Sequence, residues 1–142
     1  MLNKIIRNIK IHWLCFKYNI KNYSINSDGS IDVDGDVYLD FLNLEKLPLK
    51  FNYVSGDFSI YNNCITSLEG CPKEVGESFD CAKNQITSLK YSPIKVGTYI
   101  NLYMNPLESL EGYNFKSTLY CDDLHKLTRK TKLKNIINDE LD

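Results

Sequence analysis

A chain of 142 residues with 43% hydrophobic and 25% charged residues has the size and composition of one globular domain. A net charge of −1 excludes a strong overall attraction to nucleic acid, and the five cysteines contain no Cys-x-x-Cys pair that would indicate zinc. No apolar stretch approaches the ~20 residues of a membrane span, and the charged N-terminus does not fit a signal peptide. We therefore expect a cytoplasmic protein.

The first expected element is a helix over residues 2–17. Its apolar residues recur with the spacing of one helical face: Leu2, Ile5, Ile6, Ile9, Trp13 and Phe16. Residues 1–23 contain five basic residues and no acid, a charge of +5, whereas residues 24–116 contain 7 bases and 13 acids, a charge of −6. We expect the apolar face to cover the open end of the repeats that follow. A basic amphipathic helix can also lie on a membrane surface, which is the alternative.

The next element is a β-hairpin. Two short alternating runs flank Asp28 and Gly29 in YSINSDGSIDV (residues 23–33), and Asp-Gly is a common hairpin turn. The overlapping DVDGD (residues 32–36) places acids at alternate positions, as in a calcium-binding EF-hand loop. Gly35 falls at the fourth position of that loop instead of the sixth, so we interpret the segment as a turn and expect no metal and no cofactor.

A period of 21 residues runs through the middle of the chain. Asn63, Asn84 and Asn105 keep this step, and the apolar positions around them keep it too: Val54, Val75 and Val96; Phe58, Phe79 and Ile100; Ile65, Ile86 and Leu107; Leu68, Leu89 and Leu110. One step earlier, Leu42 replaces the asparagine. Such a unit buries its apolar residues only against its neighbours, so the period predicts a solenoid with one strand and one return loop per unit. We expect the asparagines to form a structural ladder that hydrogen-bonds the turn backbone.

This pattern resembles the leucine-rich repeat. The segments after Leu68 and Leu89, such as EGCPKEVG, contain Pro72 and Pro93 and cannot be regular helices, which is similar to the short bacterial type of this repeat. The fuller pattern SDGSIDVDGDV, LPLKFNYVSGDF and SLEGCPKEVG resembles small repeat proteins of bacteriophages and bacteria, over about residues 24–116. The resemblance implies an α/β leucine-rich-repeat solenoid with short parallel strands, and the host cytoplasm as the location of a phage-encoded protein.

The chain ends in a partial repeat and a helical segment. Residues 117–124 fit one last strand after a slip of about two residues, and Asp122 or Asp123 is a suitable N-cap. The expected apolar side of the helix is Leu124, Leu127, Leu133, Ile136, Ile137 and Leu141. We expect the basic stretch KLTRKTKLK to be solvated, with a phosphate or nucleic-acid contact as the alternative. The single domain, residues 1–142, thus divides into an N-terminal helix and hairpin cap (1–32), four 21-residue repeats (33–116), and a partial repeat with a helical cap (117–142).

The register also assigns the strand residues that face outward, on the expected concave side. They are mostly aspartate and tyrosine: Asp36, Tyr38, Asp40, Asp57, Ser59, Tyr61, Asp80, Tyr99, Asn101, Tyr103 and Tyr120. Tyrosine is enriched at protein interfaces, and acids favour a basic or amide-rich partner. We therefore predict a non-enzymatic protein-binding module, such as a phage or bacterial protein that modulates a host or defence protein.

We expect no catalytic residues, because the cysteines form no motif with the two histidines. We also expect no small-molecule substrate, and neither nucleic acid nor a membrane as the main partner. The alternative function belongs to a different class. It is a membrane-surface or nucleic-acid adaptor that uses the basic N-terminal helix or the C-terminal basic stretch.

Overall fold

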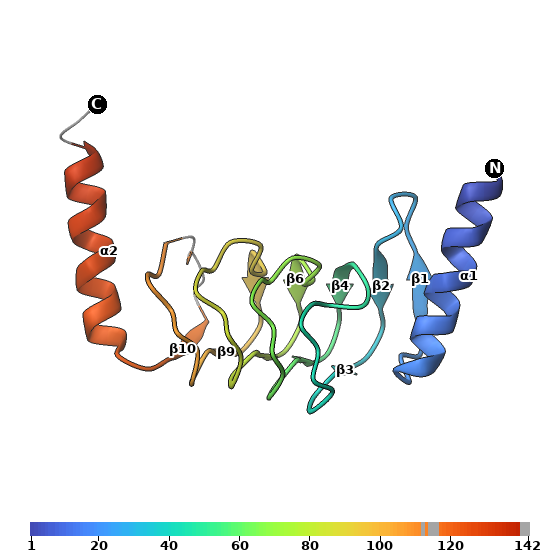
Figure 1. The fold of residues 1–142 in the computed structure, drawn as a ribbon, viewed down its shortest axis with the longest axis horizontal. Coiled ribbons are helices and arrows are strands. Elements are labelled where there is room, and N and C mark those ends of the chain that lie inside the picture. Colours follow the sequence, from blue (N-terminus) through green and yellow to red (C-terminus); the bar gives the residue numbers. More distant parts are fainter. Residues whose placement is uncertain (112, 114–116, 140–142) are drawn as a thin grey trace.

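The computed structural model describes residues 1–111, 113 and 117–139, and it shows an α/β solenoid between two end helices (Figure 1). Helix α1 (Leu2–Lys17) stands at one end of the row of strands, and helix α2 (Leu124–Asp139) stands at the other. The strands form two five-stranded sheets, which we call sheet A and sheet B. The predicted class and the predicted end helices are therefore correct.

Each full turn of the solenoid gives one short strand to each sheet. Sheet A contains, in order, β1 (Tyr23–Ile25), β2 (Ile31–Val33), β4 (Phe51–Val54), β6 (Glu74–Val75) and β8 (Lys95–Val96). Sheet B contains β3 (Val37–Tyr38), β5 (Phe58–Ser59), β7 (Phe79–Asp80), β9 (Tyr99–Asn101) and β10 (Thr118–Tyr120). All neighbouring strands are parallel except β1 and β2, which pair antiparallel and form the predicted hairpin.

The 21-residue period is the register of the strands. In sheet B, Phe58 pairs with Phe79, which pairs with Ile100. The last strand follows with the expected slip, because Thr118 pairs with Tyr99, a separation of 118 − 99 = 19 residues against 21. Sheet B is thus the row of strands that the sequence predicts.

Sheet A corrects the prediction of one strand per repeat. The valine that opens each repeat belongs to a second strand, and Val33, Val54, Val75 and Val96 pair in turn across the sheet. Two of these strands are only two residues long. Each of these sheet-A strands contributes one recurring valine without a second recurring apolar residue two positions away, whereas sheet B has such a pair in Phe58 and Ile60. Only sheet B therefore shows the alternation of apolar and polar residues that predicts a strand.

The core lies between the two sheets and the return loops. In one repeat, Phe51 and Val54 of sheet A face Phe58 and Ile60 of sheet B, and Ile65 and Leu68 close the remaining side. The rings of Phe51 and Phe58 lie 4.9 Å apart, and those of Phe58 and Phe79 lie 5.9 Å apart. Each such side chain contributes about 1.5–3 kcal/mol on burial, but only when the next repeat covers it.

An asparagine ladder joins the repeats at the turn after each strand of sheet B. Asn84 Oδ1 accepts from the Ile65 N–H at 2.9 Å, and its Nδ2 donates to the Ile60 carbonyl at 2.9 Å. Asn63 and Asn105 bond the preceding repeat in the same way. Asn63 Oδ1 accepts from the N–H groups of both Leu42 and Leu44, and it thereby serves the repeat that lacks its own asparagine.

Directly after the valine of sheet A, the backbones of adjacent repeats approach so closely that no side chain fits between them. A Cβ atom on Gly76 would lie 2.0 Å from the carbonyl oxygen of Ser55, and a Cβ atom on Gly97 would lie 1.8 Å from that of Gly76. The Gly97 N–H donates to the Val75 carbonyl at 3.0 Å, so this close approach is part of the ladder of sheet A. Glycine is required there for space.

Helix α1 packs on the solenoid through a different face from the one predicted. Ile11 and Cys15 are buried, and Leu14 and Tyr18 pack against the same core. The six residues predicted to cover the repeats are all exposed: Leu2, Ile5, Ile6, Ile9, Trp13 and Phe16. Ile9 and Ile11 point about 200° apart on a helix, so the two sets lie on opposite sides.

This error has a physical origin in the sequence. Ile11, Leu14, Cys15 and Tyr18 also follow the i, i+3, i+4, i+7 spacing of a helical face. The helix is therefore apolar on two opposite sides, and spacing does not say which side the protein covers. Two side chains of the helix also bond the hairpin: His12 Nδ1 and the Tyr23 hydroxyl lie 2.6 Å apart, and Arg7 donates to the Ser27 carbonyl at 3.1 Å.

Helix α2 begins at Leu124, directly after Asp123, as predicted. Leu127 is buried, and the Leu110 N–H donates to Thr131 Oγ1 at 3.0 Å, so the first turns of the helix contact the last repeat. The basic residues Lys126, Arg129 and Lys130 are exposed. The side chains of Leu133, Ile136 and Ile137, and all of Leu141, lie outside the described residues. Within the described part of the chain, no helix is long and apolar enough to span a membrane.

Candidate binding surface

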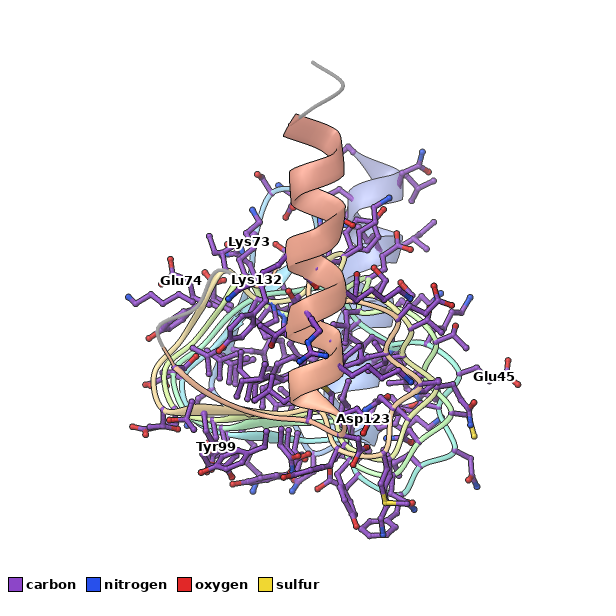
Figure 2. All side chains as sticks on the ribbon, turned by 90° about the vertical axis from the view of Figure 1, so that its left-hand side faces the viewer. Glu45, Lys73, Glu74, Tyr99, Asp123 and Lys132 are labelled. Atoms are coloured by element: carbon purple, nitrogen blue, oxygen red, sulfur yellow. The ribbon has the colours of Figure 1, made fainter. Side chains whose placement is uncertain are left out.

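The strands of sheet B align the outward residues in rows. Tyr38, Ser59, Asp80, Asn101 and Tyr120 pair one after another across the sheet, which confirms the predicted middle row and its extension to Tyr120. Figure 2 looks along the stack and shows Tyr99 projecting from this side, while Glu74 of sheet A projects from another. We call this surface the sheet-B face. It comprises Asp36, Tyr38, Asp40, Asp57, Ser59, Tyr61, Asp80, Tyr99, Asn101, Tyr103 and Tyr120.

Several aspartates of the sheet-B face also hold the stack together. Asp36 Oδ1 accepts from the Asp57 N–H at 2.8 Å, and Asp57 Oδ1 accepts from the Ser78 N–H at 2.9 Å. Asp40 Oδ1 accepts from the Tyr61 N–H at 2.8 Å. Each carboxylate thus reaches the backbone one repeat further on. The 21-residue spacing of Asp36 and Asp57 is a signal for this role, which the predicted binding role does not include.

The centre of the face is bonded within itself. Asp80 accepts from the Ala82 N–H at 2.9 Å and from Asn101 Nδ2 at 3.0 Å. Ser59 is only 7% exposed, and its hydroxyl donates to Asp40 Oδ1. The prediction that Ser59 faces a partner therefore needs correction, since the neighbouring carboxylate covers it.

A cluster of three tyrosines occupies the face near its C-terminal end. The ring of Tyr120 lies 5.8 Å from that of Tyr99 in an edge contact and 6.4 Å from that of Tyr103 in a stacked contact. All three remain exposed, between 38% and 45%. Aromatic pairs of this kind contribute about 0.5–1.5 kcal/mol beyond area burial. The tyrosine cluster, Tyr99, Tyr103 and Tyr120, is therefore ordered in advance and still open to a partner.

The other tyrosines lie toward the N-terminal end of the face. Tyr38 is exposed, and its hydroxyl donates to Asp57 Oδ2 at 3.2 Å. Burial, followed by the charges of Asp57 and Asp36, raises the pKa of Tyr38, which keeps the hydroxyl protonated. Tyr61 is half-buried, with the Phe41 ring 5.3 Å away and Lys83 Nζ 5.3 Å from its ring centroid. Tyr61 thus already binds a cation of its own chain.

Left-handed turn residues form a further row beside the face. Phe41, Asn62, Lys83 and Met104 follow the 21-residue step and have φ values of 59°, 54°, 54° and 57°. Of these, only Asn62 suits a positive φ, and the bulky residues are uncommon there. Phe41 and Met104 are both exposed, so the row adds apolar surface next to Tyr61 and Tyr103. The sequence does not predict this row, because its four side chains share neither size nor polarity.

The DVDGD acids take part in the same inter-repeat bonding. Asp32 accepts from Asn52 Nδ2 at 2.7 Å, and Asp34 accepts from Ser55 Oγ at 3.0 Å.

Burial raises the pKa of the Cys71 and Cys81 thiols, which disfavours the reactive thiolate. Among the described residues, no group of three or more His, Cys, Asp and Glu side chains could hold a metal ion.

The sheet-B face therefore combines exposed tyrosine rings with carboxylates. Asp36, Asp40, Asp57 and Asp80 lie on it, and Lys83 lies at its edge. Such groups can contact cations and amides. Comparisons with protein-family models, with curated proteins and with solved structures give no match.

Proposed function

We propose that this chain is a non-enzymatic protein-binding module whose partner contacts the sheet-B face. The observation that carries the proposal is the tyrosine cluster, in which the Tyr120 ring contacts those of Tyr99 and Tyr103 and all three rings remain exposed. Rings fixed by their neighbours lose little conformational entropy on binding, and tyrosine combines a large contact area with a hydroxyl group.

The partner surface is basic or rich in amides. A Lys or Arg side chain of the partner stacks on an exposed tyrosine ring while a nearby aspartate compensates its charge. The contact between Lys83 and the Tyr61 ring supports this mode, because it is the same interaction within one chain. The carboxylates repel phosphate, so we propose a protein partner for this face, and not a nucleic acid.

We further propose that the solenoid is of the leucine-rich-repeat type found in bacteria and bacteriophages. The 21-residue pattern of asparagine and aliphatic residues supports this assignment, as do the buried Ile65, Leu68, Ile86 and Leu89. A host or defence protein as the target follows only from that resemblance, which is an argument by analogy of fold.

The test compares three forms of the full chain as baits for host proteins. The Tyr103→Ala, Tyr120→Ala double variant removes two rings of the cluster. Tyr53→Ala is the matched control, because Tyr53 is 39% exposed but belongs to β4 of sheet A. We expect a protein that the wild type and Tyr53→Ala retain, and that the double variant binds at least about ten-fold more weakly, a change of about 1.4 kcal/mol.

Circular dichroism establishes that all three forms are folded. Equal binding of the same protein by the double variant would place the site elsewhere. Capture of nucleic acid or lipid without any protein would refute the proposed class of partner.

A further inference from the structure

The outer side of helix α1 carries an apolar surface that the fold leaves uncovered. We call it the outer stripe. Its exposed fractions run from 50% at Ile5 to 86% at Phe16, and its residues are Leu2, Ile5, Ile6, Ile9, Trp13 and Phe16. They recur over the whole helix, which is about 24 Å long. Soluble monomers rarely expose contiguous apolar patches of more than a few hundred Å², and larger ones mark interaction sites.

The solenoid does not need the outer stripe. The inner side of α1, with Ile11 and Cys15 buried, already closes the end of the stack. Figure 1 shows α1 at one extreme of the molecule and α2, the other helix of the described residues, at the opposite extreme, so α2 does not cover its outer side. A helix that is apolar on two opposite sides is typical of a position with contacts on both. The contact on the outer side of α1 must therefore come from something other than the described residues of this chain.

The charges near the stripe favour an anionic surface. Residues 1–23 contain five basic residues and no acid. Lys10 and Lys17 are exposed and flank the stripe on the side of Trp13, and Lys17 Nζ lies 5.4 Å from the Trp13 ring. Two copies of the chain packed through this stripe would bring basic residues together without any acid between them. Charge complementarity therefore disfavours a second copy of the helix.

We propose that α1 docks on an anionic membrane surface. The helix lies parallel to the bilayer, with the side chains of the outer stripe at the boundary between headgroups and acyl chains. Lys10 and Lys17 contact the lipid phosphates. Apolar burial and attraction to anionic lipid are the two contributions that hold such helices at an interface, and Trp is enriched at that depth.

This proposal reverses the expectation that a membrane is not a partner. That expectation assumed that the outer stripe caps the repeats, and the structure shows that it does not. The proposal is independent of the sheet-B face.

Trp13 provides a direct test, because it is the only tryptophan of the chain and lies within the stripe. The full chain is mixed with vesicles of phosphatidylcholine alone, or with about one-third phosphatidylglycerol added as the anionic lipid. We expect the anionic vesicles to bind the protein in flotation and to shift the Trp13 emission to shorter wavelength. Added salt should weaken the binding.

Matched variants distinguish vesicle binding through the outer stripe from nonspecific adsorption of the protein. Ile9→Asp places a charge in the stripe, and Ile94→Asp makes the same change at an exposed isoleucine of the repeats. We expect Ile9→Asp to reduce vesicle binding at least about ten-fold, while Ile94→Asp leaves it unchanged. Lys10→Gln and Lys17→Gln should each reduce binding to anionic vesicles about five-fold, as expected for about 1 kcal/mol per basic residue. These four side chains are exposed, and circular dichroism verifies the fold of each variant.

Three results would overturn the proposal. The first is wild-type protein that does not bind anionic vesicles. The second is binding that Ile9→Asp does not weaken. The third is a wild-type dimer in sedimentation, without vesicle binding, that Ile9→Asp dissociates, which would assign the stripe to a second copy of the chain.

Discussion

Replacing Asn84 with alanine removes one step of the ladder that joins successive repeats. Asn84 is buried, and its side chain bonds the Ile65 N–H and the carbonyls of Ile60 and Cys81, with a longer contact to the Ala82 carbonyl at 3.3 Å. The Ile60 and Cys81 carbonyls each keep a second donor, from Asn63 and from Asn105 respectively, and the Ala82 carbonyl keeps the Asn62 N–H. The Ile65 N–H has no such replacement among the bonds described, so it becomes the unsatisfied group.

The expected loss of stability follows from the hydrogen bonds that Asn84→Ala removes. A buried N–H without a partner costs about 1–3 kcal/mol, and each lost bond to a carbonyl that keeps another donor adds a fraction of about 1 kcal/mol. We therefore expect Asn84→Ala to lower the free energy of unfolding by about 2–4 kcal/mol. Asn84→Asp should be at least as harmful at neutral pH, because a carboxylate cannot donate to these carbonyls.

The assay is urea unfolding followed by circular dichroism, with Gln85→Ala as the matched control. Gln85 is the next residue and is exposed, so its truncation should change the unfolding free energy by less than about 0.5 kcal/mol. A loss below about 0.5 kcal/mol for Asn84→Ala would refute the reasoning, since the ladder would then not hold the repeats together. A loss as large for Gln85→Ala would refute it as well.

Three further predictions concern the stack, its turns and its thiols. Gly97→Ala should lower the free energy of unfolding by about 2–4 kcal/mol, because its Cβ would lie 1.8 Å from the Gly76 carbonyl oxygen, and an unchanged urea midpoint would contradict that close approach. Met104→Asn should raise it by about 0.5–1 kcal/mol, because asparagine tolerates the φ of 57° better, and a lower midpoint would argue against strain there. Ellman's reagent should modify the exposed Cys64 rapidly and the four buried cysteines only on unfolding. A second cysteine that reacts rapidly in the folded protein would disprove the burial.

The parts of the fold that the sequence predicts are those that every repeat must satisfy in the same way. Asn63, Asn84 and Asn105 recur because each turn leaves the same backbone groups to be bonded. Phe58 and Phe79 recur because each layer of core has the same volume to fill. Such repetition gives the register without a structure. The parallel strands of sheet A repeat as well, but each contributes a single recurring valine and shows no alternation that would distinguish it from a loop.

The sequence does not predict which side of α1 packs on the repeats, or which side chains surround an outward residue of the sheet-B face. The two apolar sides of α1 are equally regular in spacing, and only the contacts of Ile11 and Cys15 show which side is packed. At the sheet-B face, alternation gives the direction of Ser59 but not the carboxylate of Asp40 that covers it. Tyr38, Tyr99, Tyr103 and Tyr120 are exposed, as their outward register predicts, whereas Tyr61 is half-buried.

The two proposed surfaces are compatible with each other. Helix α1 stands at one end of the stack (Figure 1), and its outer stripe lies opposite the buried Ile11 and Cys15. The sheet-B face runs along the side of the stack. An anionic bilayer attracts the +5 charge of residues 1–23 and repels the −6 charge of residues 24–116, so the solenoid should extend away from the lipid.

Hydrogen exchange on anionic vesicles tests this orientation. The amides of α1 are already bonded within the helix, and membrane contact should slow their exchange further by restricting its opening. The amides of β9 and β10 should keep the rates that they have in solution, because their edge of the sheet-B face stays in water. Slower exchange in β9 and β10 would mean that the tyrosine cluster itself meets the lipid, and the face would then not be free for a protein while α1 is bound. Unchanged rates in both regions, on protein shown by flotation to be bound, would place the membrane contact on neither surface.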